Sequence, residues 1–555
     1  MISIMIDSEL AQYAREIKHT FGFIFQSLGY NHRTISNPDQ LRHNDILIIY
    51  SLSQPALEYL EAIAQHYVLI HIIADPKLFD YRAMSPDQLR RYIREIKLLT
   101  MTPVISERKF DLPAEHISDP LAQFGKINFD VIGNAFFHLA ELEPLIDKHR
   151  DANGYFPDEA SAFYQWRDFP YVESMLWLID SLIKELCRVK KQYLVQKAYY
   201  PEGQQACVML THSVDKLQKW DFNRIVLSTV DDLVMLFTFK WQQLFRNIGS
   251  KMRYLFTNYE MYWNFDEYRT LERDFNQKST YFFAAEPGAD VDYHLDDTDL
   301  QEEIAGILRE GHEIGLLATE DKLNRDDFVA RKQILLQQIH RSELGIRQSH
   351  YLQNDTIQDL HQKLSPRFGS STSFKETPGY KKGIACPHYA WVNSLKSTFL
   401  EIPVVYRESF LRINKYRHIS LEDAKQQIKK YFHSTTRIRG VFCIDFTISG
   451  FTDTPYCKKL YEYILALLKT AKLWQTTGLE LATWWEKRAR VVIEEGEYEI
   501  GINFPDDLGH FVLQTFNDVR IKEIVGSPAS IDGNLIKFSN IKADSYAVIR
   551  IQQEQ

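Results

Sequence analysis

The feature that most constrains the fold is a strand-then-helix rhythm that begins at Cys207 and continues to about Arg488. Chains that repeat this unit form a parallel sheet covered by helices. About 280 residues of such units is the size of a (β/α) barrel. The expected strands are CVMLTH, STYFFAAE, HEIGLL, EIPVVY and VFCIDF, with less regular ones near residues 344–347 and 382–386. The sequence therefore predicts an α/β protein with a barrel over residues 206–488.

The predicted barrel is flanked by three other segments, as expected for a chain of 555 residues. Residues 1–135 alternate helices with buried strands such as ILIIYS and VLIHIIA, which predicts an N-terminal α/β domain. No glycine-rich phosphate loop follows these strands, which favours a structural or docking role over nucleotide binding. Residues 136–205 are interpreted as a helical bridge, with Trp177 buried between domains. Residues 489–555 predict a small antiparallel β domain.

Composition excludes some functions and leaves carbohydrate binding open. The net charge is -9, so the chain lacks the basic footprint of a nucleic-acid-binding protein. The five cysteines are scattered without a CxxC pair, which indicates neither a disulfide framework nor a structural zinc site. The first residues do not resemble a secretory signal, and we expect no membrane span. The expected location is the cytoplasm.

Several phrases occur in an order typical of one enzyme family. They are FDVIGNAFFHLAELE, NGYFPDEASAF, VMLTHSVD, GHEIGLL, LGIRQSHYL, LEIPVVY and TTGLELATWWEKR. Over this span the chain resembles the polysaccharide deacetylases, which are NodB-like carbohydrate esterases, in a bacterial subgroup with an N-terminal α/β domain. The resemblance implies an aspartate as general base and a divalent metal, usually zinc, held by a second aspartate and two histidines. It also implies a later histidine as general acid.

The chain departs from the family pattern at the catalytic positions. Ser213 stands where the resemblance places the general base, and Asp445 stands where it places the acid histidine. Asp215 is the one metal ligand that is retained. Leu317 replaces a histidine ligand, and the polar residue four positions later is Asp321. Because a catalytic zinc site needs about three protein ligands, the pattern predicts impaired catalysis and no bound zinc.

Other residues are candidates for a carbohydrate cleft at the C-terminal ends of the strands. Arg347 matches the family's arginine motif, and Asp215 and Asp445 either bind a cation or sugar, or pair with Arg347 or a lysine. A rebuilt metal site from Asp215, His350, His388 and Asp445 is an alternative. The predicted substrate-binding residues are His212, whose alternative role is to order its loop, and Tyr351, His388, Tyr389 and Trp391 on the rim.

Three hypotheses follow. The leading one is a catalytically impaired deacetylase-like protein with an open cleft, which binds a carbohydrate or serves a polysaccharide-processing assembly and needs no cofactor. The second is an active metal-dependent deacetylase of N-acetylated glycans, with zinc or another divalent cation in a rebuilt site. The third is a structural interaction protein whose cleft is filled.

Overall fold

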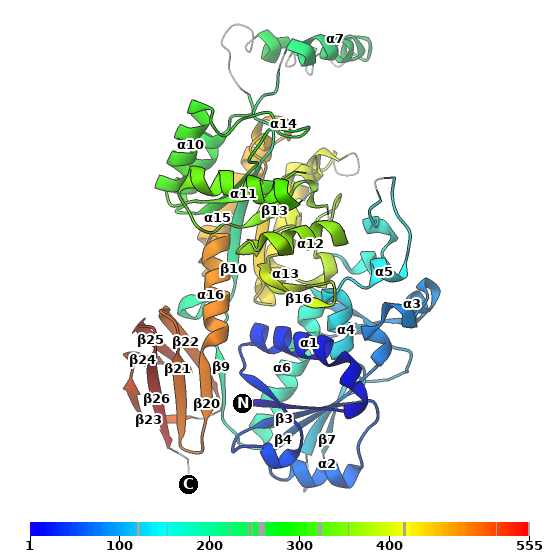
Figure 1. Cartoon of the computed structure of the whole chain (residues 1–555), viewed down its shortest axis with the longest axis vertical. Coiled ribbons are helices and arrows are strands. Elements are labelled where there is room, and N and C mark those ends of the chain that lie inside the picture. Colours follow the sequence, from blue (N-terminus) through cyan, green and yellow to red (C-terminus); the bar gives the residue numbers. More distant parts are fainter. Residues whose placement is uncertain are drawn as a thin grey trace.

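The predicted strand–helix repeat forms a curled ten-stranded sheet in the computed structural model (Figure 1). The structure describes residues 1–555 except 119–122, 153, 221, 240, 242–243, 246–247, 253–260, 320–324, 353, 414–417, 518 and 553–555. At the centre of the sheet, β10 (Cys207–Val214) lies between β11 (Ser279–Phe283) and β18 (Val441–Asp445). On the β11 side the sheet continues with β12 (Glu313–Ala318), β13 (Ile346–Gln348), β14 (Phe368–Gly369), β16 (Leu395–Glu401) and β15 (His388–Val392). On the other side β17 (Tyr406–Arg407) follows β18. The short strand β19 (Trp474–Gln475) also pairs with β10.

The sheet curls because one segment bonds to strands on both of its sides. β16 and β17 are joined by residues 402–405. The N–H groups of Ile402 and Val404 donate to the carbonyls of Gly369 and Thr372, each at 2.8 Å. The next N–H, of Val405, donates to Cys443 on β18 at 2.9 Å. Every pairing in the sheet is parallel except β15 with β16.

Helices follow the strands, because each connection between parallel strands must cross one face of the sheet. The last of them, α16, begins with a capping box in which the side chains of Thr477 and Glu480 bond to each other's backbone N–H. The helices are α9 (Phe265–Asp274), α10 (Thr298–Arg309), α11 (Arg325–Ile339), α12 (Asp355–Leu364), α13 (Leu421–Arg437), α14 (Gly450–Asp453), α15 (Cys457–Lys469) and α16 (Gly478–Arg490).

The N-terminal residues form a six-stranded sheet in the order β2-β1-β3-β4-β8-β7, with only β7 antiparallel to its neighbour. Its central strand β3 is buried along its whole length, as its apolar sequence predicts. The strands are β1 (Ile2–Ile6), β2 (His32–Ile35), β3 (Ile46–Ser51), β4 (Val68–Ile73), β7 (Ala114–Ser118) and β8 (Gln123–Ile127), with a separate hairpin of β5 (Ile93–Lys97) and β6 (Met101–Ile105). The helices are α1 (Ala14–Leu28), α2 (Leu57–Ala64), α3 (Pro86–Tyr92), α4 (Val131–Leu139) and α5 (Glu143–Ile146).

Helix α6 (Tyr171–Val189) contacts the N-terminal sheet on one side and the segment that leads into β15, residues 381–386, on the other. Its Asp180 accepts a hydrogen bond from Tyr30 at 2.7 Å. Its buried Glu173 accepts from the backbone N–H groups of residues 385 and 386, at 2.7 and 2.8 Å. Trp177 is only half-buried, with the guanidinium of Arg439 5.1 Å from its ring centroid. Buried polar contacts as well as apolar ones therefore hold α6 between the N-terminal residues and the segment before β15.

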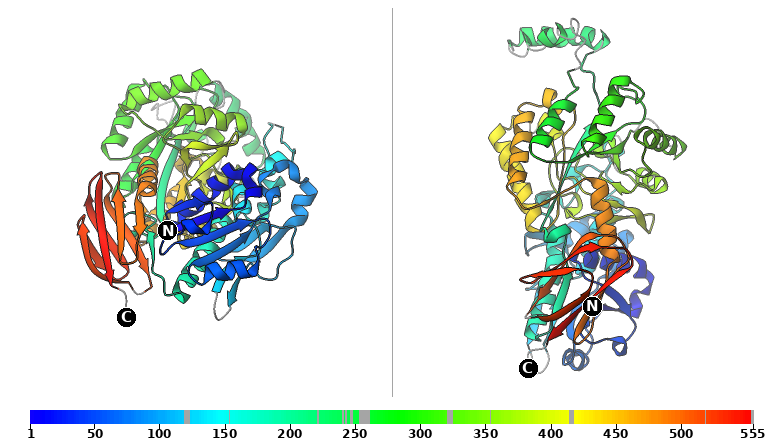
Figure 2. Two further views of the ribbon diagram at one scale, coloured as in Figure 1. Left: turned by 60° about the horizontal axis from the view of Figure 1, so that its bottom comes forward. Right: turned by 90° about the vertical axis from the view of Figure 1, so that its left-hand side faces the viewer.

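The C-terminal residues form two antiparallel four-stranded sheets around a shared apolar core (Figure 2). One sheet has the order β20 (Val492–Glu495), β21 (Glu499–Phe504), β26 (Ser545–Gln552) and β23 (Arg520–Gly526). The other has β24 (Ala529–Asp532), β25 (Leu535–Ile541), β22 (Gly509–Phe516) and β9 (Leu194–Lys197). β9 comes from the end of the predicted helical bridge. It is a strand because it covers the open edge of β22 and buries all four of its residues.

One of the expected strands is absent. The strand expected near residues 382–386 is instead a short 3-10 turn (Lys381–Gly383), in which Lys382 has a φ of 63°. Such a left-handed residue interrupts an extended segment.

In the part of the chain that the structure describes, no helix has the length and apolarity needed to cross a bilayer.

Candidate functional site

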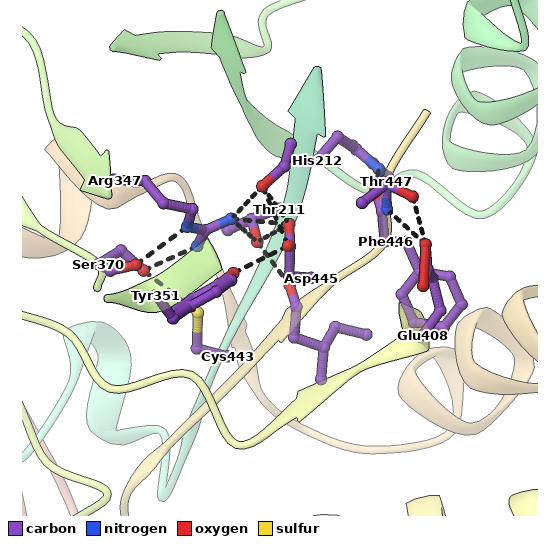
Figure 3. Close-up of polar contacts among 12 residues, drawn as sticks. Thr211, His212, Arg347, Tyr351, Ser370, Glu408, Cys443, Asp445, Phe446 and Thr447 are labelled. Carbon is purple, nitrogen blue, oxygen red and sulfur yellow. Dashed lines mark hydrogen bonds and ion pairs between the residues drawn. The ribbon is translucent and has the colours of Figure 1, made fainter. Parts of the chain in front are cut away.

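Arg347 on β13 is the centre of a buried polar cluster inside the curled sheet (Figure 3). Its Nη1 donates to Asp445 Oδ1 at 2.7 Å and to Thr211 Oγ1 at 2.8 Å. Its Nη2 and Nε donate to the hydroxyl and the carbonyl of Ser370, at 2.8 and 2.9 Å. The ring of Phe282 lies 4.1 Å from the guanidinium carbon. With an exposed fraction of 0%, this cation is held entirely by protein groups.

Asp445 is the acceptor that completes the Arg347 cluster. Its Oδ2 accepts hydrogen bonds from Ser213 Oγ at 3.0 Å and from the Tyr351 hydroxyl at 2.8 Å. Its Oδ1 accepts from Arg347, so both oxygens are occupied. The residue at the expected base position and the residue at the expected acid position therefore bond to each other. Of the two roles that the sequence allowed for Asp445, the structure shows the pairing with Arg347.

Strand register explains why these side chains meet. Thr211 is level with Asp445 on the neighbouring strand, and Leu317 is level with Arg347. Side chains alternate between the two faces of a strand, so Thr211 and Ser213 point to the same face. The C-terminal ends of parallel strands gather at one edge of the sheet, which brings distant parts of the chain together.

His212 points to the opposite face of β10 and does not reach the Arg347 cluster. Its Nδ1 lies 2.8 Å from the carbonyl of Phe446, and its Nε2 lies 2.8 Å from Oε1 of Glu272. Glu272 on α9 also accepts from Tyr461 at 2.6 Å and from Tyr281 at 3.1 Å. All these side chains are buried, so the predicted role of His212 in substrate binding is not supported by its position.

A second set of carboxylates lies beside the Arg347 cluster. Asp215, just beyond β10, is half-buried. Burial, together with the negative charge of Glu408, raises its pKa to about 6 against the opposing effects of the Lys216 N–H and the charge of Arg412. Glu408, just beyond β17, is fully buried, and burial raises its pKa. Its Oε1 accepts from the Thr447 N–H at 3.2 Å (Figure 3), whereas its Oε2 has no hydrogen-bond partner among the described residues.

Glu408 is the functional candidate that sequence reasoning missed. The available signal was its position directly after the LEIPVVY strand, where side chains at the C-terminal edge are expected. Together with Arg412, it gives this edge a charged group that the family pattern did not indicate.

The residues predicted to form the rim do not do so: Tyr351 lies at this edge but is buried, and the others lie elsewhere. Tyr351 is buried in the Arg347 cluster, and His350 is exposed with its Nε2 2.8 Å from Asp290. His388, Tyr389 and Trp391 lie on β15, where they line a cavity of about 400 Å³ shared with α1. The physical reason is that β15 runs antiparallel to the other strands, so its side chains pack on the N-terminal helix rather than at the common strand ends.

The ligand set does not fit the zinc site that the resemblance implies. Leu317 is buried on the same face as Arg347 and offers no donor atom. Both nitrogens of His212 have protein partners, and Asp321 lies outside the described residues. Among the described residues there is no group of three or more His, Cys, Asp or Glu side chains that could hold a metal. We therefore derive no chemical step through zinc.

The Arg347 cluster is closed, whereas the sequence predicted that these residues would lie in an open cleft. Arg347, Asp445, Ser213 and Tyr351 are all buried, and their hydrogen bonds are made to one another. Desolvation of polar groups is tolerated here because each has a partner. Any ligand at this edge would meet Asp215 and its half-exposed neighbours instead.

Comparison with known proteins gives one sequence match and several structural ones. Residues 5–188 match a family described as a family of unknown function, DUF7033. No curated protein matches the chain. A crystal structure of Agd3, described as a novel carbohydrate deacetylase, is 8% identical with a TM-score of 0.39, covering 100% of this chain and 98% of its own. A putative polysaccharide deacetylase from Mycobacterium smegmatis is 14% identical, with a TM-score of 0.35. That match covers 51% of this chain and 91% of the other one.

A probable polysaccharide deacetylase from Pseudomonas aeruginosa PAO1 is also 14% identical, with a TM-score of 0.36, and the match covers 52% of this chain and 94% of that one. The chain is thus similar over residues 5–188 to a family of unknown function, and its likeness to the solved deacetylase structures stays below a TM-score of 0.5.

Proposed function

We propose that this protein is a polysaccharide-deacetylase-like carbohydrate-binding protein that has lost deacetylase chemistry, with the curled sheet serving as its (β/α) barrel. The observation that carries the proposal is the closed cluster of Ser213, Asp445 and Arg347. A general base needs a free lone pair within reach of a water molecule. Here the serine hydroxyl donates a hydrogen bond to Asp445, and both oxygens of the aspartate accept hydrogen bonds from protein donors. Neither group is available to a substrate.

Carbohydrate binding is supported by half-exposed polar groups at the same edge of the sheet. Asp453 accepts a hydrogen bond from the Tyr262 hydroxyl at 2.9 Å, and lies 3.6 Å from the ammonium of Lys219 and 3.7 Å from Arg412. Lys219 also lies 5.7 Å from the centroid of the Tyr262 ring, and the charge of Asp215 acts on both Tyr262 and Arg412. Such a combination binds sugar hydroxyls without any requirement for net charge.

The test combines acetate release with binding. We expect no acetate from N-acetylglucosamine oligomers above the buffer background, with or without added zinc. We expect calorimetry to detect binding, and Asp453→Asn to weaken it about tenfold, because one charged hydrogen-bond acceptor is lost. The matched control is Asp532→Asn, which changes an exposed carboxylate paired with Lys537 in the C-terminal sheet.

Two results would contradict this proposal. Acetate release by the zinc-loaded protein would favour an active deacetylase with a rebuilt metal site. Absence of binding to a broad panel of glycans would favour a structural interaction protein with a filled cleft.

A second candidate function, an active metal-dependent hydrolase, is favoured by the position of Glu408. Glu408 has an unpartnered, buried carboxylate oxygen, and its charge acts on Asp215. Oxygen donors of this kind suit Mg²⁺ or Mn²⁺ better than zinc. In this case calorimetry with Mn²⁺ would detect binding that is lost in Glu408→Gln and retained in Glu523→Gln, an exposed control. Binding would also weaken as the pH falls below about 6, where Asp215 becomes protonated. Absence of Mn²⁺ binding at neutral pH would exclude this candidate.

A further inference from the structure

A helical hairpin between β10 and α9 stands clear of the rest of the molecule (Figures 1 and 2). Its first arm is α7 (Phe222–Phe237). In its second arm the described residues 241, 244–245 and 248–252 are helical. The hairpin leaves the molecule at the end of β10, which is the same edge of the sheet as the candidate site.

The hairpin exposes an unusual amount of apolar surface. Single exposed apolar side chains are common on proteins, whereas a gathered set marks an interaction surface. Phe237 and Phe239 are each 77% exposed, and Phe245 is 68% exposed. The exposed large apolar residues of the hairpin are Val230, Leu233, Val234, Leu236, Phe237, Phe239, Trp241, Phe245, Ile248 and Met252.

This exposure is not a sign that the hairpin lacks internal contacts. Trp220 donates its indole N–H to Ser250 Oγ at 3.0 Å, and the ammonium of Lys251 lies 5.2 Å from the Trp220 ring. Lys251 also forms an ion pair with Asp232, and Leu244 is buried. One face of the hairpin is therefore used to hold its two arms together. The ten exposed apolar side chains point away from these contacts and are accessible to a partner.

The charge of this segment indicates which partner fits. Residues 222–259 contain five basic residues and two acidic ones, although the whole chain has a net charge of -9. The acidic residues are Asp231 and Asp232, and Lys251 is paired with Asp232. The other four basic residues, Arg224, Lys240, Arg246 and Arg253, contribute here only their sequence charge. Phe, Trp and Leu combined with Lys and Arg are typical of helices that lie in a membrane interface.

We propose that this hairpin attaches the protein to the surface of an anionic membrane without spanning it. The exposed rings and aliphatic chains insert at the boundary between headgroups and acyl chains, and the basic side chains are attracted to anionic headgroups. Because the hairpin begins where β10 ends, attachment turns the candidate-site edge of the sheet towards the membrane. The attachment does not depend on what that site binds.

The test is co-sedimentation of the full chain with lipid vesicles. We expect binding to phosphatidylcholine vesicles that contain phosphatidylglycerol, little binding to phosphatidylcholine alone, and weaker binding as salt screens the charges. Replacing Phe237, Phe239 and Phe245 together by serine should reduce partitioning by about tenfold or more, since three large apolar side chains no longer insert. The matched control replaces Val525, Ile531 and Tyr546, exposed apolar residues of the C-terminal sheet, by serine.

The outcomes separate the possible partners of the hairpin. Loss of vesicle binding in the hairpin variant but not in the control supports the proposal. Failure of the wild type to bind anionic vesicles, or equal loss in both variants, would overturn it. A concentration-dependent dimer in analytical ultracentrifugation that disappears in the hairpin variant, without vesicle binding, would show that the surface pairs with a second copy of the chain instead.

Discussion

Replacing Arg347 by methionine is expected to lower the free energy of unfolding by about 3–5 kcal/mol, because it leaves Asp445 as an uncompensated buried charge. Methionine retains much of the arginine volume, so packing against Phe282 changes little. The serine hydroxyl of residue 370 would also lose its donor. Urea unfolding followed by tryptophan fluorescence measures this change.

Two further variants test whether the loss of stability comes from the buried ion pair of Arg347 with Asp445. Arg550→Met removes an exposed ion pair with Glu523, and we expect a cost of about 0–1 kcal/mol. Combining Arg347→Met with Asp445→Asn removes the buried charge and should recover part of the lost stability. An Arg347→Met protein as stable as the wild type would mean that Asp445 is solvated, and that the Arg347 cluster is open to ligands.

Replacing Glu272 by alanine is expected to have an effect of similar size, about 3–5 kcal/mol. This carboxylate accepts hydrogen bonds from His212, Tyr461 and Tyr281 in a fully buried site, and alanine would leave all three without their shared acceptor. Thermal unfolding measured by circular dichroism would show the lower midpoint. The control is Asp274→Ala, an exposed position on the same helix.

The pH dependence gives this prediction a second readout. Burial alone would raise the pKa of Glu272, but the charge and hydrogen bonds of its partners, His212 first, hold it below the usual value. A carboxyl whose folded pKa is depressed stabilises the protein above its unfolded pKa, and this contribution is lost as the pH falls through the folded pKa. The wild type should therefore lose stability in acid below the usual glutamate pKa. In Glu272→Gln this component should be absent, and an unchanged acid profile would contradict the assignment.

Local sequence patterns were sufficient to predict most of the strands and helices of the central region. Period-two and fully apolar runs such as CVML and VFCID predict buried strands because local patterning specifies burial. The prediction of a lost ligand at Leu317 and of a lost base at Ser213 rests on the family resemblance together with residue identity, since a leucine side chain has no atom that binds a metal. The antiparallel pattern of residues 489–555 was also readable, because its turns are marked by Gly, Asp and Pro.

Which of these residues contact one another depends on how the strands pair in the folded protein. His212 and Ser213 are neighbours in sequence but face opposite sides of β10, and Asp445 reaches Ser213 across 232 residues. The direction of β15 sends His388 and Trp391 to the N-terminal helix, which no local signal specifies. Strand order, register and direction are set by contacts between distant segments, so the composition of the candidate site emerges only when the sheet curls and brings its strand ends together.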